Sequence, residues 1–435
     1  MFCRNCGNQI PEGAKFCNAC GTKTEQVEQK PAAAPTARKP AGKKKKINPL
    51  VLILAAVFAV AVIVSVSFNM SIPDIVRTLG RGEPLTQRGY YDLENALKEM
   101  DDSVRVSQDN WDTSVCRWDN IEFFLRDYLQ ANPEFYYVDI RNTSFTHVES
   151  SDNSSYGLHL AYFDELATEQ AAQKLEAAAN GILSGIPAGA TDWETALYLH
   201  DALIRHVTYE EGSYDQTAYG ALVEGKAVCM GYTMAYEYLL TKAGIDCDTV
   251  IGYTNELSAA MDGTLFQMDQ HAWTIVTFHE GGVDRSYYVD TTWDDTGLKD
   301  ANGEDYVSHR WFCATQQDMD REGRSTSQTG YDMDRWNLDD DTMNYYVYSG
   351  YVIDSYDLEE VIRIMDSQIQ AGQNSPSVRV ADVQTYYDLS FAMVENGDFQ
   401  KLCDGLGIES CAYNFTYNYL GDGLICFDLY LNYPG

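Results

Sequence analysis

The chain is poor in basic residues. Among its 435 residues, 31 Lys and Arg stand against 65 Asp and Glu, which gives a formal charge of −34. A negative surplus of this size excludes nucleic acid or another polyanion as the main partner. The charge is also uneven, because residues 1–46 carry ten basic and three acidic side chains and residues 47–435 therefore carry a net −41. A basic N-terminal segment and an acidic remainder of the chain indicate two different environments.

The chain also lacks the composition of a disordered or a fibrous protein. Apolar residues make up 45% of it and charged residues 22%, which is enough apolar material for globular cores. At roughly 150 residues per domain, two or three globular units fit this length.

Residues 50–68 form an uncharged run with only two serines, LVLILAAVFAVAVIVSVSF. Its length is close to the roughly 20 residues that a helix needs to span the hydrocarbon of a bilayer. A cleaved signal peptide is the alternative, but the run begins after some fifty residues and no clear small-x-small cleavage site follows it. A buried core helix is usually amphipathic rather than apolar all round. The run therefore predicts a single transmembrane helix.

Basic residues flank this predicted span unequally. Within about twenty residues, seven lie on its N-terminal side and three on its C-terminal side, so the positive-inside rule places the N-terminus in the cytoplasm and everything after Phe68 outside the cell. Residues 24–49 are rich in Pro, Ala, Lys and Gly and predict a flexible basic linker. Its four consecutive lysines would be attracted to anionic lipid, which makes the bilayer a partner. Residues 69–84 are expected to be a juxtamembrane linker.

Two Cys-x-x-Cys pairs stand at the N-terminus, separated by ten residues and each followed by glycine; they are Cys3, Cys6, Cys17 and Cys20. Each pair lets two thiolates converge on one ion, and four thiolates form a closed, structural zinc site without chemistry of its own. Residues 1–23 resemble the short zinc-ribbon modules at the start of many bacterial membrane proteins. The alternatives are a disulfide or a redox pair, which a reducing cytoplasm disfavours.

The segment 218–245 reads AYGALVEGKAVCMGYTMAYEYLLTKAGI. Gly225 supplies a turn, Cys229 stands where a helix of small and apolar residues begins, and Gly244 suits the C-cap of that helix. A helix N-terminus favours the thiolate through its dipole and its free amides, which lowers the thiol pKa and makes Cys229 a candidate nucleophile. The same amides can form an oxyanion hole.

A base and an orienting acid are expected on the hairpin that follows. His271 opens the strand pattern HAWTIVTF, and after the turn at 279–282 the strand RSYYVDTTWDD brings Asp290 back roughly opposite His271. A carboxylate at that place can orient the imidazole and stabilise its charged form. Each of the three residues has an ordinary structural alternative: a buried thiol, a core histidine and a cap residue.

In this order, GKAVCMGY, HAW and YYVDTTWDD resemble the transglutaminase-like superfamily, and the resemblance runs from about Trp193 to Asp295. It implies an α+β, papain-like core in which the helix that bears the nucleophile packs on an antiparallel sheet. It also implies that Cys229 is the nucleophile, His271 the base and Asp290 the orienting acid, and that catalysis needs no cofactor. Inactive members with an intact triad are compatible with the same motifs.

Further residues of this segment are assigned more loosely. We expect Tyr232, Trp273 and Trp293 to line or support a substrate cleft. His200 and His206 lie on a helix that begins near a Thr191-x-x-Glu194 capping box, and we interpret them as packing or surface residues.

Smaller α+β regions are expected on both sides of the core. Residues 85–184 predict a helix over 121–130, strands over 134–140 and 156–164, and a helix over 166–183; residues 185–320 form the catalytic core. Residues 321–435 predict a helical stretch from 381 to 406 and strands over 411–420 and 423–432. Seven cysteines lie beyond Phe68, an odd number, so at least one is unpaired; Cys403 and Cys411 are near enough in sequence for a local disulfide.

These patterns together predict a membrane-anchored thiol enzyme whose catalytic domain lies outside the cell. It would transfer acyl groups from protein or peptide amides through a thioester on Cys229, as a transglutaminase, a deamidase or a cysteine peptidase. A second hypothesis is a non-catalytic sensor or scaffold that binds cell-wall or peptide ligands, with the zinc ribbon recruiting a cytoplasmic protein partner. A third is an adhesin in which Cys229 reacts once and stays cross-linked.

Overall fold

The structure is a computed structural model that describes residues 85–111, 121–148, 155–255, 268–326, 333, 336–409, 411–416 and 424–433. The predicted zinc ribbon, basic linker, transmembrane run and juxtamembrane linker all precede residue 85 and lie outside these ranges. No helix within the ranges is both long enough and apolar enough to cross a membrane.

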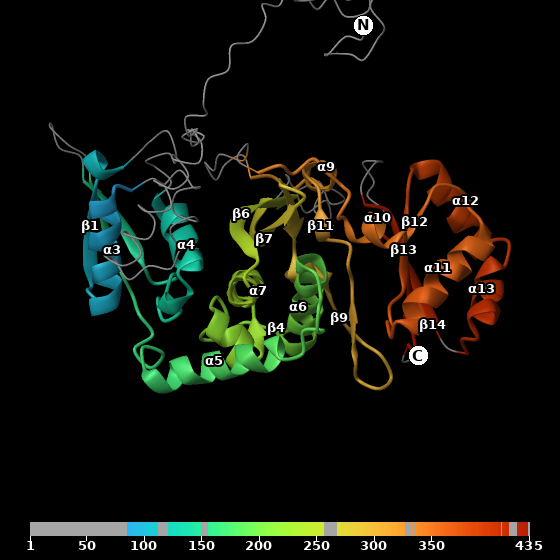
Figure 1. The fold of residues 1–435 in the computed structure, drawn as a ribbon, viewed down its shortest axis with the longest axis horizontal. Coiled ribbons are helices and arrows are strands. Elements are labelled where there is room, and N and C mark those ends of the chain that lie inside the picture. Colours follow the sequence, from blue (N-terminus) through green and yellow to red (C-terminus); the bar gives the residue numbers. More distant parts are fainter. Residues whose placement is uncertain are drawn as a thin grey trace, which may run out of the picture. The chain divides into compact units, whose positions relative to one another are not determined.

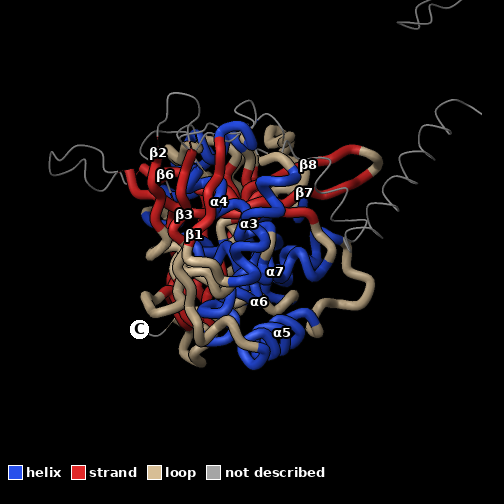
Figure 2. Tube along the Cα trace, turned by 90° about the vertical axis from the view of Figure 1, so that its left-hand side faces the viewer, coloured by secondary structure: helices blue, strands red, loops and turns tan. Residues whose placement is uncertain are grey.

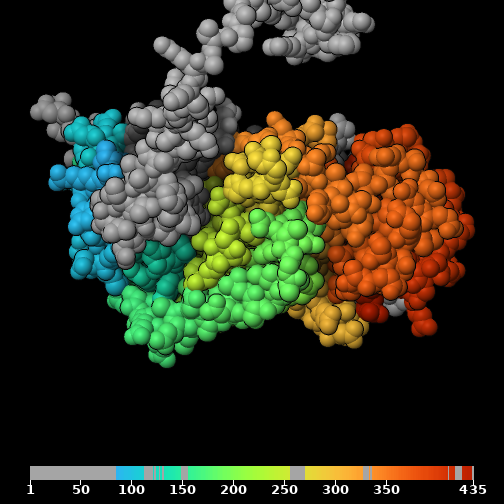
Figure 3. All heavy atoms as spheres, in the orientation of Figure 1, coloured from blue at the N-terminus to red at the C-terminus, as the bar shows by residue number. Residues whose placement is uncertain are grey.

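A four-stranded antiparallel sheet organises the middle of the described chain, with strand order β11-β8-β7-β6. Three helices gather on one side of it, α7 directly against β6 and β7, then α6 and α5 (Figures 1 and 2). Figure 3 shows α5, in green, on the molecular surface. The elements are α5 (Glu169–Leu183), α6 (Asp192–His206), α7 (Cys229–Ala243), β6 (Asp246–Asn255), β7 (Met268–Glu280), β8 (Val283–Val289) and β11 (Phe312–Ala314).

Both faces of this sheet are buried. Along β7, Val276 and Phe278 belong to the core that α6 and α7 complete, while Trp273 and Ile275 belong to a second core on the opposite face. The alternation follows from the two-residue period of a strand, and a sheet covered on both faces needs apolar residues at both phases. The run HAWTIVTF meets that need, and a turn at residues 281–282 joins β7 to β8.

Helices α6 and α7 begin where the sequence predicts, and α7 also ends at its predicted C-cap. The Thr191 side chain accepts the amide of Glu194 and the Glu194 carboxylate accepts the amide of Thr191, so the capping box of α6 is formed. Helix α7 begins at Cys229 and ends at Ala243, and its C-cap Gly244 has a positive φ of 82°, the left-handed conformation that glycine adopts most readily. The predicted helix that starts at the candidate nucleophile is confirmed.

Short elements connect these larger ones. Before α7 come β4 (Thr208–Tyr209), the π-helical turn η4 (Gly220–Glu224) and β5 (Lys226–Ala227), and β4 pairs with β5 in parallel. After β8 come α8 (Thr291–Asp294), the antiparallel pair β9 (Asp295–Lys299) and β10 (Asp305–Val307), and α9 (Gln316–Arg321).

The region before the core is an α+β unit with its own apolar cluster. Its strands form an antiparallel sheet of order β1-β3-β2. Apolar side chains of its helices pack on that sheet and form a cluster of their own. The elements are α3 (Gln87–Glu99), β1 (Ser103–Ser107), η1 (Gln108–Asn110), α4 (Ile121–Ala131), η3 (Pro133–Phe135), β2 (Ser144–Val148) and β3 (Ser155–His159).

One prediction in this region is wrong. Residues 134–140 do not form a strand; Pro133 opens the 3₁₀ turn η3, and the following residues make only an isolated bridge between Val138 and Tyr162. Pro133 has φ suited to the start of a helical turn and no N–H to give to a sheet. The apolar residues that suggested a strand are instead divided between two cores, with Phe135 in the cluster of the N-terminal region and Tyr136 in that of α6 and α7.

The last region is a second α+β unit. Its sheet has the order β12-β13-β15-β14, in which β12 and β13 are parallel and the other pairs antiparallel. The predicted helical stretch and the two strands after it are confirmed as α12, α13, β14 and β15. The elements are α10 (Tyr345–Ser349), β12 (Val352–Ile353), α11 (Leu358–Gln370), β13 (Ser377–Val380), α12 (Val383–Val394), α13 (Asp398–Leu406), β14 (Cys411–Thr416) and β15 (Cys426–Leu431).

The core extends beyond the boundaries that we predict from the sequence. Helix α5, assigned to the region 85–184, packs Leu175 and Ala179 into the cluster that contains α6 and α7, and Tyr345 from beyond residue 320 lies in the same cluster. Residues 80–435 form one compact unit. The six described cysteines form no disulfides, and this includes Cys403 and Cys411, whose sulfur atoms are 3.2 Å apart.

Gly231, in the first turn of α7, is a close-approach position. A Cβ there would lie 2.2 Å from the carbonyl oxygen of Asp215 and 2.8 Å from the Cβ of Ala227. Gly231→Ala is therefore expected to destabilise the fold by about 1–3 kcal/mol, the usual cost of overpacking. The matched control is Gly181→Ala, an exposed glycine of α5 with nothing within 4 Å of the added Cβ, which is expected to stabilise by up to about 1 kcal/mol. Equal urea midpoints for the two variants would contradict the close contact between Gly231 and the Asp215 carbonyl.

Candidate active site

Cys229 is the first residue of α7. The N-cap residue Val228 offers no side-chain acceptor to the first turn, and that turn contains no acidic residue. The positive end of the helix dipole therefore faces the Cys229 thiol without a competing carboxylate. The backbone N–H of Val228 donates to the carbonyl of Asp215 at 3.0 Å, which fixes the direction in which the chain enters the helix.

His271 and Asp290 meet at the end of the β7–β8 hairpin. Thr274 pairs with Val289, and Asp290 follows directly. Nε2 of His271 lies 2.8 Å from Oδ2 of Asp290. Because Asp290 is also the N-cap of α8, its Oδ1 accepts the backbone N–H of Trp293 at 3.1 Å. Because Nε2 is bonded to Asp290, Nδ1 is the imidazole nitrogen left for the hydrogen bond between His271 and the Cys229 thiol.

The pKa values of the thiol and the imidazole shift in opposite directions. Burial alone would raise the pKa of Cys229, but the hydrogen bond and charge of His271, with the backbone of Ala272, outweigh burial and hold that pKa below its ordinary value. Burial alone would lower the pKa of His271, but the charge and hydrogen bond of Asp290, with Cys229, raise it to about 9. The two shifts favour a thiolate–imidazolium pair at neutral pH.

Asp290 has a second cationic partner that the sequence analysis did not identify. Arg324 is buried and its Nη1 donates to Oδ2 of Asp290. Burial opposes ionisation of Asp290, but the charges of His271 and Arg324 more than offset it and keep the pKa of Asp290 well below its usual range. Arg324 lies in the region that we assigned to a separate C-terminal unit, and no local pattern marks it.

A second buried network of histidines and carboxylates lies next to this site. His200 of α6 is 3.0 Å from Asp201 and 3.2 Å from Asp294 of α8, and His309 is 2.8 Å from Asp201. Burial would lower the pKa of His200, but its hydrogen bonds to both carboxylates raise it to about 9. His200 is therefore a charged link between α6 and α8, which refines its interpretation as a packing residue.

This network also holds the candidate metal ligands of the described residues. His200, Asp201 and His309 present ligand atoms within 4.8 Å of one another. Each of these groups already has a hydrogen-bond partner inside the network, and the Asp294 carboxylate accepts the backbone N–H of Trp311 at 3.1 Å. The three side chains are therefore accounted for by hydrogen bonds to one another and to Asp294. His206, the other histidine of α6, bonds the Leu222 carbonyl at 2.8 Å.

Of the three predicted cleft residues, only Trp293 is accessible. It is 46% exposed, and its ring centroid lies 6.0 Å from that of His271. Trp273 and Tyr232 are buried: Trp273 covers Gly252 of β6, and the Tyr232 hydroxyl donates to Asp295 at 2.6 Å. Because both side chains are enclosed, they support the site from behind and do not line an open cleft.

Tyr209 is an exposed aromatic residue on the Cys229 side that the sequence analysis overlooked. It pairs with Ala227 across β4 and β5, and its ring lies 6.3 Å from that of Tyr232. Burial and the neighbouring Cys229 raise the pKa of its hydroxyl. Tyr209 and Trp293 are thus two exposed aromatic residues close to Cys229 and His271.

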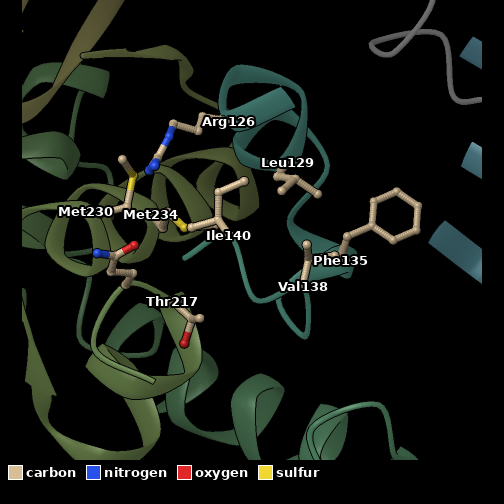
Figure 4. A pocket seen from close by; sticks show the side chains of 9 residues that line it. Arg126, Leu129, Phe135, Val138, Ile140, Thr217, Met230 and Met234 are labelled. Carbon is tan, nitrogen blue, oxygen red and sulfur yellow. The ribbon is translucent and has the colours of Figure 1, made fainter. Parts of the chain in front are cut away.

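A hollow of about 20 Å³ adjoins the first turns of α7. Figure 4 shows Met230 and Met234 of α7 on one side of it and Leu129, Phe135 and Val138 of the N-terminal region on the other. A larger cavity of about 270 Å³ shares part of its lining and continues along residues 138–142 and 212–217. Met230 follows Cys229 directly, so the hollow lies beside the helix turn that carries Cys229.

Two parts of the chain match known families. Residues 177–289 match the model of the transglutaminase-like superfamily. This match includes α6, Cys229 and His271 and ends one residue before Asp290, and the mixed α/β content of the transglutaminase-like core fits the observed sheet and helices. Residues 2–24 match the zinc-ribbon domain, which supports zinc binding by the four N-terminal cysteines. No curated protein matches the sequence.

Three solved structures share parts of the fold. The first is a TGase, with 12% identity and a TM-score of 0.24 over 40% of this chain and 49% of the other. The second, from Cytophaga hutchinsonii and assigned as a cysteine protease, has 13% identity and a TM-score of 0.22 over 39% and 66%. The third is menin, with 14% identity and a TM-score of 0.20 over 66% and 51%. The chain spans about half the length of the TGase.

The transglutaminase-like match and the joined Cys229, His271 and Asp290 support a thiol enzyme in the broad sense. We expect Cys229 in the full chain to react with iodoacetamide at pH values below the ordinary thiol range near about 8.5. His271→Ala removes the contacts that lower the thiol pKa and leaves burial, so its reactivity should move above that range. Peptide mass spectrometry measures both rates, with buried Cys313 as an internal control. An identical pH profile in the two proteins would contradict the pairing.

Proposed function

We propose that the transglutaminase-like core is an acyl-transfer enzyme that acts on protein or peptide amides through a thioester on Cys229. The observation that carries this proposal is the placement of the three side chains. A thiol at an uncapped helix start faces an imidazole whose other nitrogen is held 2.8 Å from a buried carboxylate. This arrangement activates a nucleophile and supplies a proton donor for the leaving group.

The reaction proceeds in two halves. The Cys229 thiolate attacks the amide carbonyl carbon, and the oxyanion that forms is stabilised by the amides at the start of α7. His271 gives its Nδ1 proton to the departing amine, the carbon–nitrogen bond breaks, and a thioester remains. Water or a second amine then attacks the thioester while neutral His271 takes its proton, the carbon–sulfur bond breaks, and the acyl product leaves with the thiolate–imidazolium pair restored. Asp290 stays ionised and keeps the imidazole oriented throughout.

We further propose that residues 50–68 anchor the chain in a bilayer, with the zinc ribbon in the cytoplasm and the thiol domain outside the cell. The uncharged run and the basic residues before it support this placement. Zinc would be structural in the ribbon and take no part in the reaction. The substrate would then be a protein or peptide outside the cell, and the ribbon would be available to a cytoplasmic protein partner.

A binding scaffold without turnover is the second candidate, and one observation favours it. His271 is only 7% exposed and Cys229 is half-buried, so the imidazole that would protonate a leaving group offers a substrate little open surface. In that case the exposed Tyr209 and Trp293 would contact a ligand above an unreactive pair.

Turnover of amide substrates separates the two candidates. The full chain in detergent is offered glutamine-containing peptides, with and without a primary amine, and ammonia release, amine incorporation and peptide cleavage are followed. We expect at least one of these reactions, lost by 10³-fold or more in Cys229→Ala because the nucleophile is removed. Binding of peptides with no product and no thioester adduct by intact mass would favour the scaffold.

The zinc ribbon has its own test. The full chain is expected to hold one zinc ion that Cys17→Ser releases, while thiol reactivity at Cys229 is unchanged because the ribbon does no chemistry. Metal analysis by mass spectrometry gives the stoichiometry. Loss of Cys229 reactivity together with the zinc would contradict a purely structural metal.

A further inference from the structure

Arg324 occupies an unusual position for a charged side chain. It follows α9, is 3% exposed, and lies among three tryptophan rings. Its guanidinium carbon is 3.6 Å from the ring centroid of Trp311, 4.4 Å from that of Trp293 and 5.7 Å from that of Trp273. Aromatic faces attract a guanidinium that has lost water, so the three rings hold Arg324 in one place.

The only acid that Arg324 contacts among the described residues is Asp290. Its Nη1 donates to Oδ2, while Nη2 has no hydrogen-bond partner within the same part of the chain. The nearby Arg310 and Glu322 satisfy each other in an ion pair of 2.8 Å. A buried cation is costly unless it is paired, so the Trp-enclosed guanidinium is committed to this one carboxylate.

Arg324 and His271 bind the same oxygen atom. Oδ2 of Asp290 accepts from Nε2 of His271 and from Nη1 of Arg324, and Oδ1 accepts from the backbone of Trp293. Both oxygens of the carboxylate are therefore engaged by three donors. The carboxylate cannot rotate without breaking one of these bonds, and its negative charge is divided between two cations.

We propose that Arg324 is a positioning residue for the catalytic pair, which fixes Asp290 against His271 and limits the basicity of the imidazole. A carboxylate that is shared with a permanent cation stabilises an imidazolium less than an unshared one does. The ionisable groups that face His271 are then Cys229 from α7, Asp290 after β8 and, through Asp290, Arg324. The proposal rests on the proposed function, because it assigns Arg324 to the nucleophile–base pair.

The test uses an anionic reagent, iodoacetate, on the full chain. Its reaction with Cys229 is fastest when the thiolate lies beside an imidazolium. The rate therefore falls at high pH as His271 loses its proton, and this fall, the alkaline limb of the rate profile, reports the ionisation of His271. In Arg324→Met, a side chain of similar length without charge, the alkaline limb is expected to move to higher pH by about one unit, a tenfold change in proton affinity. Arg324→Lys keeps a cation, so its alkaline limb should lie at nearly the same pH as that of the unmodified chain.

A matched control separates this effect from loss of a positive charge in general. Arg310 lies 5.3 Å from the Trp311 ring but does not contact Asp290, so Arg310→Met should lower the rate without moving the limb. Arg324→Gln serves as the second neutral variant if Arg324→Met does not fold by circular dichroism, and it should show the same shift.

The outcomes distinguish the two proposals. An alkaline limb that stays in place in a folded neutral variant, or that moves equally in Arg324→Lys, overturns the role of Arg324 while Cys229 remains a reactive thiol. Absence of any fast, low-pH reaction in the unmodified chain overturns the proposed function itself.

Discussion

The hydrogen bond between His271 and Asp290 is the interaction on which the rest of the candidate site depends. It joins the beginning of one buried strand to the end of its neighbour. Asp290 serves two purposes at once, because the same carboxylate caps α8 through Oδ1 and accepts His271 and Arg324 through Oδ2. Because Oδ1 is bonded to a backbone N–H of α8, the backbone fixes the position of the Asp290 carboxylate. Its location is therefore as rigid as the hairpin and the helix turn that it joins.

Burial gives this interaction its chemical effect. In water, a histidine beside a thiol exchanges its partners freely, and the ion pair is weakly favoured. Here His271 and Asp290 are buried and Cys229 is half-buried, and two cationic side chains, His271 and Arg324, share the carboxylate of Asp290. The second network of His200, Asp201, Asp294 and His309 adds support from behind, since Asp294 ends the short helix that Asp290 begins. Two buried charge clusters thus hold the ends of one four-residue helix.

The sequence predicts what local patterns determine. The small, apolar helix after Gly225 places Cys229, the apolar run HAWTIVTF places His271, and the returning strand places Asp290; the structure brings the three together. Arg324 and His309 could not be found in this way, because their partners lie 34 and 108 residues away and only the tertiary fold joins them. The burial of Tyr232 and Trp273 has the same origin. The strand expected over 134–140 fails because its apolar residues serve two different cores, which a single strand pattern does not reveal.

The most direct test of the ion pair between Cys229 and His271 is the ionisation of His271 itself. Nuclear magnetic resonance of the imidazole nitrogens follows its proton across pH in the full chain, and loss of one signal in His271→Gln assigns it among the seven histidines. We expect His271 to hold its proton up to a pH of about 9, because Asp290 and the Cys229 thiolate outweigh burial. A histidine that loses its proton below the ordinary value of about 6.5, as burial alone would cause, would contradict the ion pair.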